Sequence, residues 1–315
     1  MTETRTEDEI RNFVRDRYGE VAECDTATQS GEGCGCAPDA SSATVNEKKG
    51  KVSGSLGYSK TELASLPEGA DMGLSCGNPV ALALVSEGET FLDLGSGGGF
   101  DCFIAGPKVG PTGRVIGVDM TPAMISKARA GVTKYRERTG LDNVEFRLGE
   151  IEHLPVADAS VDAVISNCVL NLSPDKPQVW RDIARALKPG GRVAVSDIAL
   201  LKPLPKEIAD DLLMLSGCIS GAVTLDEYTS HIEAVGLTNI RVEPKPQAGD
   251  VWDYYNDPLL DKIKEKLPAG IKMGDYAVSV NVTAIKPGGD ARAAKAHAAA
   301  AATASAASTP GGCCG

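Results

Sequence analysis

The chain has few aromatic residues and very few histidines. Phe, Trp and Tyr make up 4% of its 315 residues, so it offers little surface for stacking on the flat rings of an organic substrate. The three histidines, His153, His231 and His297, lie in separate parts of the chain and suggest no catalytic triad. Chemistry that depends on imidazole or on aromatic recognition is therefore disfavoured.

Basic surface and long apolar runs are lacking as well. The formal net charge is -11, whereas a protein that binds nucleic acid normally carries a basic stripe. Residues 1–10 show neither a basic n-region nor an apolar h-region, and no later run is long enough to span a bilayer. We expect a cytoplasmic protein with reduced thiols that acts on a small molecule, with no nucleic-acid or membrane partner.

Cysteine, in contrast, is plentiful, with nine residues. Cys102 lies in a helix-like apolar stretch and is expected in the core, and Cys24 is not assigned to a site. Several other thiols fall beside glycines or at strand ends, where side chains become accessible: Cys34, Cys36, Cys76, Cys168 and Cys218. In an intracellular protein this distribution favours ligation of a soft metal or metalloid, or redox chemistry, over structural disulfides.

Short β-rich runs alternate with helix-like segments in the middle of the chain. Helices are expected near 99–109, 122–139 and 177–188, and the expected strands are Phe91–Leu94, Val115–Val118, Val144–Leu148, Val161–Ile165 and Val193–Val195. Such alternation predicts an α/β fold with a doubly wound, mostly parallel sheet. Its ligands should bind beyond the carboxyl ends of the strands.

The rest of the chain is expected to form a smaller lobe and flexible ends. Residues 1–57 are predicted to hold a short amphipathic helix followed by a mobile, Cys-bearing segment from about residue 19. Residues 58–199 are expected to form the main domain and 200–286 a C-terminal lobe. Whether the last strand of this lobe joins the sheet of the main domain is left open. Residues 287–315 form a disordered, alanine-rich tail that ends in Cys313 and Cys314.

A glycine-rich loop follows the first strand of the main domain. In Asp93-Leu-Gly-Ser-Gly-Gly-Gly-Phe-Asp101, Gly95, Gly97 and Gly99 allow the backbone to approach a ligand and to present its amide donors. Asp119 ends the next strand, where a carboxylate can accept hydrogen bonds from both hydroxyls of a ribose. The loop and this acid together predict a site for a nucleotide-type cofactor.

Three successive motifs indicate which cofactor is bound. The glycine loop, Asp119-Met-Thr-Pro122 and Gly149-Glu-Ile-Glu-His-Leu-Pro155 resemble those of class I methyltransferases, which have a Rossmann-like fold and bind S-adenosylmethionine. Met120 either packs on the adenine or is a core methionine. The resemblance implies this set of cofactor-binding residues: Asp93, Gly95, Ser96, Gly97, Gly99, Asp119, Met120, Ile151, Glu152 and Asn167.

The cysteine segments narrow the resemblance. Leu74–Pro79, Ser166–Lys176 and Ser216–Ala222 are similar to the three cysteine blocks of arsenite methyltransferases, apart from Ser75, where that family often has glycine. This similarity implies that Cys76, Cys168 and Cys218 bind the As(III) substrate. It also implies a fourth cysteine on the N-terminal segment, which either Cys34 or Cys36 supplies, and the role of Cys313 and Cys314 stays open.

The implied function is methyl transfer to thiolate-bound arsenic, which gives mono- and dimethylated arsenicals for detoxification and leaves a trimethylated product open. A thiol reductant such as thioredoxin or glutathione would keep the cysteines reduced. Two alternatives stand beside this reading. One is a thiol protein that sequesters arsenite or another metal on a methyltransferase fold, and the other is a methyltransferase of another small molecule.

Overall fold

A computed structural model describes most of the chain's predicted main domain and parts of its ends. The described residues are 6–30, 53–54, 56–75, 77–209, 215, 218–245 and 272–289. The predictions for Cys34, Cys36, Cys76 and the Cys313-Cys314 tip lie outside them.

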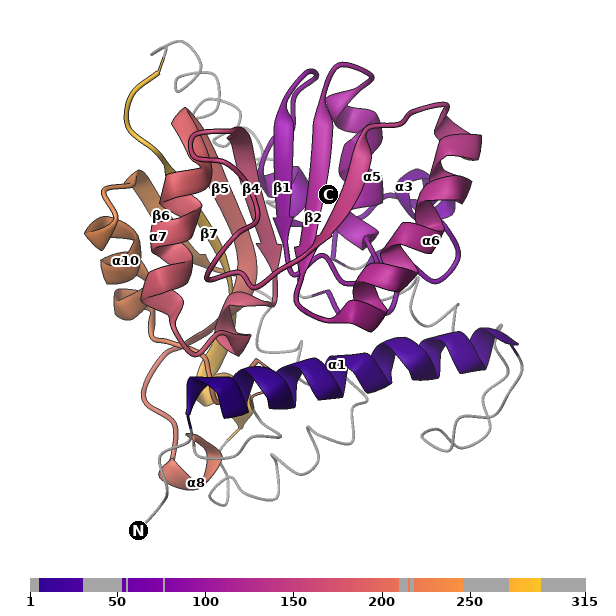
Figure 1. Ribbon diagram of the computed structural model, residues 1–315. Coiled ribbons are helices and arrows are strands. Elements are labelled where there is room, and N and C mark those ends of the chain that lie inside the picture. Colours follow the sequence, from indigo (N-terminus) through magenta and orange to yellow (C-terminus); the bar gives the residue numbers. More distant parts are fainter. Residues whose placement is uncertain are drawn as a thin grey trace, which may run out of the picture.

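A seven-stranded sheet organises the molecule (Figure 1), with the strand order β3-β2-β1-β4-β5-β7-β6. Strands β1 to β5 are parallel, and β7 runs antiparallel to both β5 and β6. The strands are β1 (Thr90–Leu94), β2 (Arg114–Asp119), β3 (Val144–Leu148), β4 (Val161–Asn167), β5 (Leu187–Leu200), β6 (Thr238–Pro244) and β7 (Ala277–Ile285). The predicted class is confirmed, and the segment expected to form a smaller lobe adds two strands to the same sheet.

Helices cover both faces of the sheet. Side chains of α7 (Lys176–Ala186) and α10 (Leu225–Ala234) form one core with β1, β2, β4, β5 and β7. Side chains of α4 (Pro79–Leu82), α5 (Phe100–Val109) and α6 (Pro122–Thr139) form the second core on the opposite face. The shorter elements are α3 (Lys60–Ser65), α8 (Lys206–Ala209), η1 (Leu170–Leu172) and η2 (Met273–Asp275).

Local signals fix where several helices begin and end. Pro122 occupies the first turn of α6, and Gly140 ends that helix in the left-handed conformation. Thr224 and Glu227 form a capping box at the start of α10, in which each side chain accepts a hydrogen bond from the other residue's backbone N–H. The bounds of α6 agree with the predicted 122–139 because they depend on residues close in sequence.

The first helix, α1 (Glu7–Ser30), lies across the carboxyl ends of the strands (Figure 1). It continues well past residue 19, so the prediction of a short helix and a mobile segment is wrong for residues 19–30. Val14 and Ala22 are 1% and 2% exposed, and Val14 packs with Cys168 and Cys218 in a third apolar cluster. This burial stabilises the helix beyond the length that its local composition predicts.

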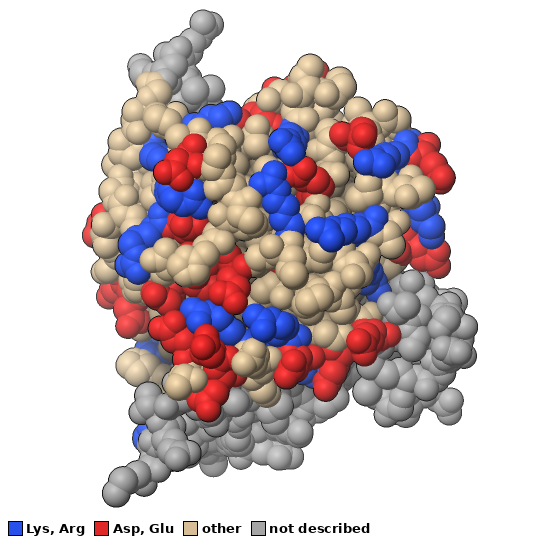
Figure 2. Space-filling view, in the orientation of Figure 1, with Lys and Arg blue, Asp and Glu red and all other residues tan. Residues whose placement is uncertain are grey.

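The face in Figure 2 carries acidic and basic side chains intermingled over α1 and the strand ends. Ion pairs such as Arg11–Glu7 and Arg15–Glu150 join neighbouring groups there. Among the described helices, none combines the length and the apolar character needed to cross a membrane.

Candidate active site

A cavity opens at the carboxyl ends of β1, β2 and β4, beneath α1. The strand order reverses between β1 and β4, which is where ligands bind in open α/β sheets. Ten residues predicted for the site line this cavity: Asp93, Gly95, Ser96, Gly97, Asp119, Met120, Ile151, Glu152, Asn167 and Cys168. The structure therefore brings together segments that are far apart in the sequence.

Of the predicted cofactor-binding residues, all of which the structure describes, Gly99 alone does not line the cavity. It caps the start of α5 with a φ of 90°. A Cβ at this position would lie 2.6 Å from the Phe146 ring and 2.8 Å from the Phe103 ring. Glycine is needed here for close packing of the helix start rather than for ligand contact.

The rest of the glycine loop forms a ligand cradle. Gly95 and Gly97 have positive φ angles of 69° and 50°, which side-chain-bearing residues seldom adopt. A Cβ on Gly95 would lie 2.4 Å from Val169, whereas one on Gly97 would meet nothing closer than 3.6 Å. The Ser96 hydroxyl between them is buried without a hydrogen-bond partner among the described residues, as expected of a group that binds a ligand.

Asp119 holds this loop in place. Its two carboxylate oxygens accept hydrogen bonds from the backbone N–H groups of Gly97 (2.9 Å) and Thr121 (2.8 Å). Burial raises the pKa of Asp119, and these two hydrogen bonds lower it. Each oxygen keeps a free lone pair, so the carboxylate can also accept hydrogen bonds from ribose hydroxyls.

Two further carboxyls, Asp93 and Asp101, are 2% and 5% exposed. Burial, followed by the charge of Asp101, raises the pKa of Asp93 well above its usual value. Burial also raises the pKa of Asp101 to about 6, although hydrogen bonds from Asn167 and Tyr58 lower it. The Tyr58 hydroxyl lies 2.7 Å from one oxygen of Asp101, and Asn167 Nδ2 lies 3.0 Å from the other.

Carboxyl groups outnumber basic groups in the lining of the cavity. The lining residues include five carboxyls, Asp71, Asp93, Asp101, Asp119 and Glu152, and one guanidinium, Arg11. Burial is the main reason that the pKa values of Asp93, Asp101 and Asp119 are raised, and a positively charged ligand would favour their ionised forms. S-adenosylmethionine fits this donor set, since its sulfonium and ammonium groups are positive and its ribose can face Asp119.

The far end of the cavity is closed by α1. The Glu152 side chain is buried and accepts a hydrogen bond of 2.5 Å from the Ser173 hydroxyl. Arg11 of α1 places its Nε 3.6 Å from Glu152, and Val14 and Tyr18 of the same helix line the cavity. The helix thus covers this part of the cavity and would limit the access of water to a bound ligand.

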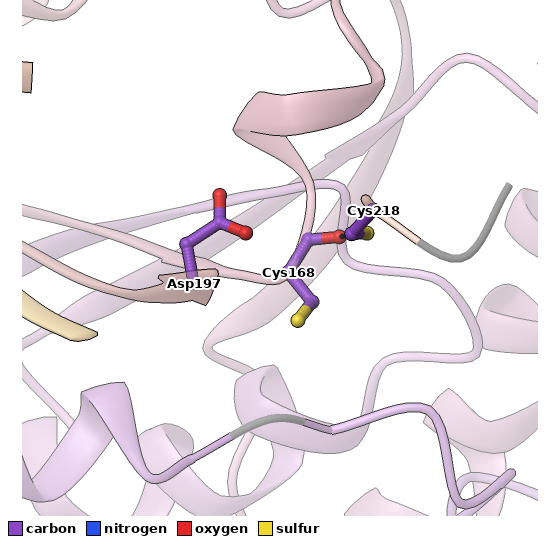
Figure 3. A group of neighbouring side chains, drawn as sticks. All are labelled: Cys168, Asp197 and Cys218. Carbon is purple, nitrogen blue, oxygen red and sulfur yellow. Dashed lines mark hydrogen bonds between the residues drawn. The ribbon is translucent and has the colours of Figure 1, made fainter. Parts of the chain in front are cut away.

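Two of the predicted arsenic ligands meet beside the cofactor cavity. Cys168 follows β4, and Cys218 lies in the turn before Gly221. The sulfurs of Cys168 and Cys218 and a carboxylate oxygen of Asp197 all lie within 4.8 Å of one another (Figure 3). Cys218 Sγ also lies 2.9 Å from the Cys168 carbonyl oxygen, to which it donates. Two soft sulfur ligands so close together suit a soft metalloid.

Asp197 is fully buried next to these thiols. It accepts hydrogen bonds from Asn171 Nδ2 (2.9 Å), the Ile198 N–H (2.8 Å) and the Tyr228 hydroxyl (3.0 Å). Burial raises the pKa of Asp197 to about 6. Burial and the nearby Asp197 charge also raise the pKa of the Cys218 thiol, so this thiol is protonated until a ligand displaces its proton.

The described cysteines differ in their oxidation state. Cys102 and Cys218 are free thiols, and Cys168 is disulfide-bonded. Cys102 is fully buried and donates to Asp93 at 3.3 Å, in agreement with its predicted place in the core. The parts of the site predicted at Cys34, Cys36 and Cys76 lie outside the described residues.

Sequence reasoning missed several residues of the site. Asp101 lies at the end of the glycine motif, and a charged residue at that position could have been predicted to belong to the site. Arg11 and Tyr58 gave no local signal, because each reaches the site from a helix or loop far from it in sequence. Asp197 ends an apolar run at the carboxyl edge of the sheet, a position typical of functional acids.

Comparisons with known proteins are consistent with this geometry. Residues 85–236 match a family model described as a methyltransferase domain. Arsenite methyltransferase from Halobacterium salinarum is 44% identical over 92% of this chain and 70% of its own length. The chain belongs to the arsenite methyltransferase family. Arsenite methyltransferase from Mus musculus is 34% identical over 75% of this chain and 60% of its own length.

A solved structure supports the same assignment. The crystal structure of an arsenic(III) S-adenosylmethionine methyltransferase from Chlamydomonas reinhardtii shares 31% identity, with a TM-score of 0.54, over 75% of this chain and 73% of that one. Family membership makes this chain an S-adenosylmethionine-dependent enzyme, which agrees with the acidic lining of the cavity.

Proposed function

We propose that this enzyme transfers methyl groups from S-adenosylmethionine to trivalent arsenic held by Cys76, Cys168 and Cys218. One observation carries the proposal: Cys168 lines the cofactor cavity, and its sulfur and that of Cys218 lie within 4.8 Å of each other. Arsenic bound there would face the place where the methyl donor fits. Mono- and dimethylated arsenicals are the expected products, with trimethylated arsenic as a further possible product.

The chemistry explains why no histidine base is needed. Three thiolates replace the oxygens of arsenite and leave the arsenic lone pair free to attack. When bound, S-adenosylmethionine supplies an electrophilic methyl group on a positive sulfur. The As–C bond forms as the S–C bond breaks, and no proton has to be removed from the nucleophile. The protein aligns the two reactants and, through α1, excludes water.

A reductant completes the cycle. Methylation oxidises arsenic by two electrons, and a pair of thiols can return them by forming a disulfide. Cys168 is disulfide-bonded in this structure, so this residue must be reduced before it can bind arsenic again. Thioredoxin or glutathione is the proposed reductant, and the need for reduced thiols supports the proposal of a cytoplasmic enzyme. Cys34 or Cys36 would help to capture arsenic or to relay these electrons.

The decisive experiment is arsenic speciation. The purified chain is incubated with arsenite, S-adenosylmethionine and either glutathione or a thioredoxin system, and the products are separated by chromatography with arsenic detection. Mono- and dimethylated arsenic should appear, and omission of the methyl donor should abolish both. A protein that binds the cofactor and arsenite but forms no methylated arsenic would instead be a sequestering protein, and the proposal would be wrong.

A further inference from the structure

Both described arsenic ligands have an unusual backbone conformation. Cys168 has a φ of 57° and Cys218 a φ of 60°, in the left-handed region that residues other than glycine rarely occupy. Such conformations persist only where the surrounding structure holds them, and they cluster at functional sites. Something outside the two cysteines must therefore fix their geometry.

Asn171 is the residue that joins the two cysteine segments. It lies in η1, three positions after Cys168, and is fully buried. Its side-chain nitrogen lies 2.9 Å from Asp197 Oδ1, 2.7 Å from the Ile198 carbonyl and 3.2 Å from the Cys218 carbonyl. One amide thus connects η1, the end of β5 and the turn that carries Cys218.

The Cys218 turn also packs directly on the Asn171 backbone. A Cβ added to Gly221 would lie 2.0 Å from the Asn171 carbonyl oxygen, so the turn can approach this closely only because residue 221 is glycine. The amide hydrogens of Asn171 have a charged acceptor in Asp197, and such hydrogen bonds are stronger than neutral ones. The contact is therefore both tight and directional.

We infer that Asn171 is a positioning residue of the arsenic site: by linking the two cysteine segments it sets the separation of the Cys168 and Cys218 sulfurs, and with it the affinity for trivalent arsenic. The inference rests on the proposed function and deepens it. Asn171 does not line the cofactor cavity, so its effect is confined to the thiol side. A purely structural role would instead show itself as lost stability alone.

Two variants separate these roles. Asn171→Ala removes the link to Cys218. Tyr228→Phe is the matched control, because it removes a buried hydrogen bond to the other oxygen of the same Asp197 carboxylate and leaves the Cys218 turn untouched. Both should lower the melting temperature by similar amounts. Arsenite affinity of the reduced protein, measured by calorimetric titration, should fall about tenfold or more in Asn171→Ala and less than about threefold in Tyr228→Phe.

Two further readouts sharpen the test. S-adenosylmethionine affinity should stay within about twofold of wild type in both variants, and thiol titration of the denatured, reduced proteins should give the same count in Asn171→Ala as in wild type, since no thiol is lost. Equal loss of arsenite affinity in both variants, in proportion to their loss of stability, would overturn the inference.

A third variant covers the case in which Asn171→Ala does not fold. Gly221→Ala retains every hydrogen-bonding group but pushes the turn away from Asn171, and it should weaken arsenite binding at unchanged cofactor affinity. Unchanged arsenite binding in that variant would also overturn the inference. Wild-type protein that binds cofactor but no arsenite would overturn the proposed function itself, and the inference with it.

Discussion

The cofactor region and the thiol region lie next to each other at one edge of the sheet but are built in different ways. The cofactor region consists of short continuous segments, chiefly 93–101, 119–121 and 151–152, whose backbone amides and carboxyls face a common cavity. The thiol region joins Cys168 and Cys218, which are 50 positions apart, through a buried polar network around Asn171 and Asp197. The first region selects its ligand by charge, and the second selects it by the spacing of soft atoms.

Replacement of a thiol should have the largest effect, because it should abolish methylation without changing cofactor affinity. Cys168→Ser and Cys218→Ser should each lower the methylation of arsenite and of monomethylated arsenic to below about 1% of wild type, because a hydroxyl is a hard, protonated group and a poor ligand for arsenic. Product formation is followed by arsenic speciation. Calorimetric titration with S-adenosylmethionine is the control and should give unchanged affinity. A serine variant that keeps substantial activity would show that its thiol is not a ligand.

Asp119→Ala is expected to have the opposite effect, which is to weaken cofactor binding and leave arsenite binding intact. Loss of the carboxylate removes contacts to ribose and frees the Gly97 amide that Asp119 holds. Hydrogen bonds to a charged group contribute roughly 1.5–3 kcal/mol, so S-adenosylmethionine affinity should fall about ten- to a hundredfold while arsenite affinity is retained. Asp119→Asn, which keeps one acceptor oxygen, should lose less. If calorimetry gives equal cofactor affinities for Asp119→Ala and wild type, the assignment is wrong.

The charge of the cofactor region should also make the affinity for S-adenosylmethionine depend on pH. The Asp101 carboxyl, with a pKa of about 6, is mostly ionised at pH 7 and mostly protonated at pH 5. Because the ionised form attracts a cationic ligand, S-adenosylmethionine affinity should rise up to about tenfold between pH 5 and pH 7. Asp101→Asn should flatten this profile, and a wild-type profile as flat as that of the variant would contradict the expectation.

The same shift has a consequence for the ligand-free protein. A raised pKa means that the folded state binds the proton more tightly than the unfolded state. The contribution of Asp101 to the free energy of unfolding is therefore fully present below the unfolded pKa of 3.8 and is lost as the pH rises to about 6. Denaturant unfolding of ligand-free wild type and Asp101→Asn across this range measures the difference.

Removal of the tail should have the smallest effect. Lys286 Nζ donates to the carbonyls of Ala184 and Leu187, and a Cβ on Gly190 would lie 3.1 Å from the Gly288 carbonyl, so the cut is best placed after Gly289. The melting temperature should change by no more than about 1–2 °C. If Cys313 and Cys314 only capture arsenite, KM should rise a few-fold at constant kcat. A collapse of kcat at normal stability would place the tail in the active site.

The sequence-based predictions are accurate where the residues involved are close in sequence and fail where they are far apart in sequence. The first four strands and α6 depend on patterns within a few positions, and their predicted bounds agree closely with the structure, whereas β5 (Leu187–Leu200) is much longer than the predicted Val193–Val195. The extension of α1 past residue 19 includes the buried Ala22, and residues close to it in sequence did not indicate this burial. The roles of Arg11 and Tyr58 were missed for the same reason.

The sequence by itself determined the fold class and the place of the glycine loop and Asp119, because each is specified by residue types at short spacing, and its resemblance to a family predicted which thiols bind arsenic. Only the tertiary structure decided that β6 and β7 join the main sheet, that α1 covers the cavity, and that Asn171 and Asp197 lie between the cysteine segments. Those features depend on the burial of groups distant in sequence. The free energy of that burial is gained only when the whole chain is folded.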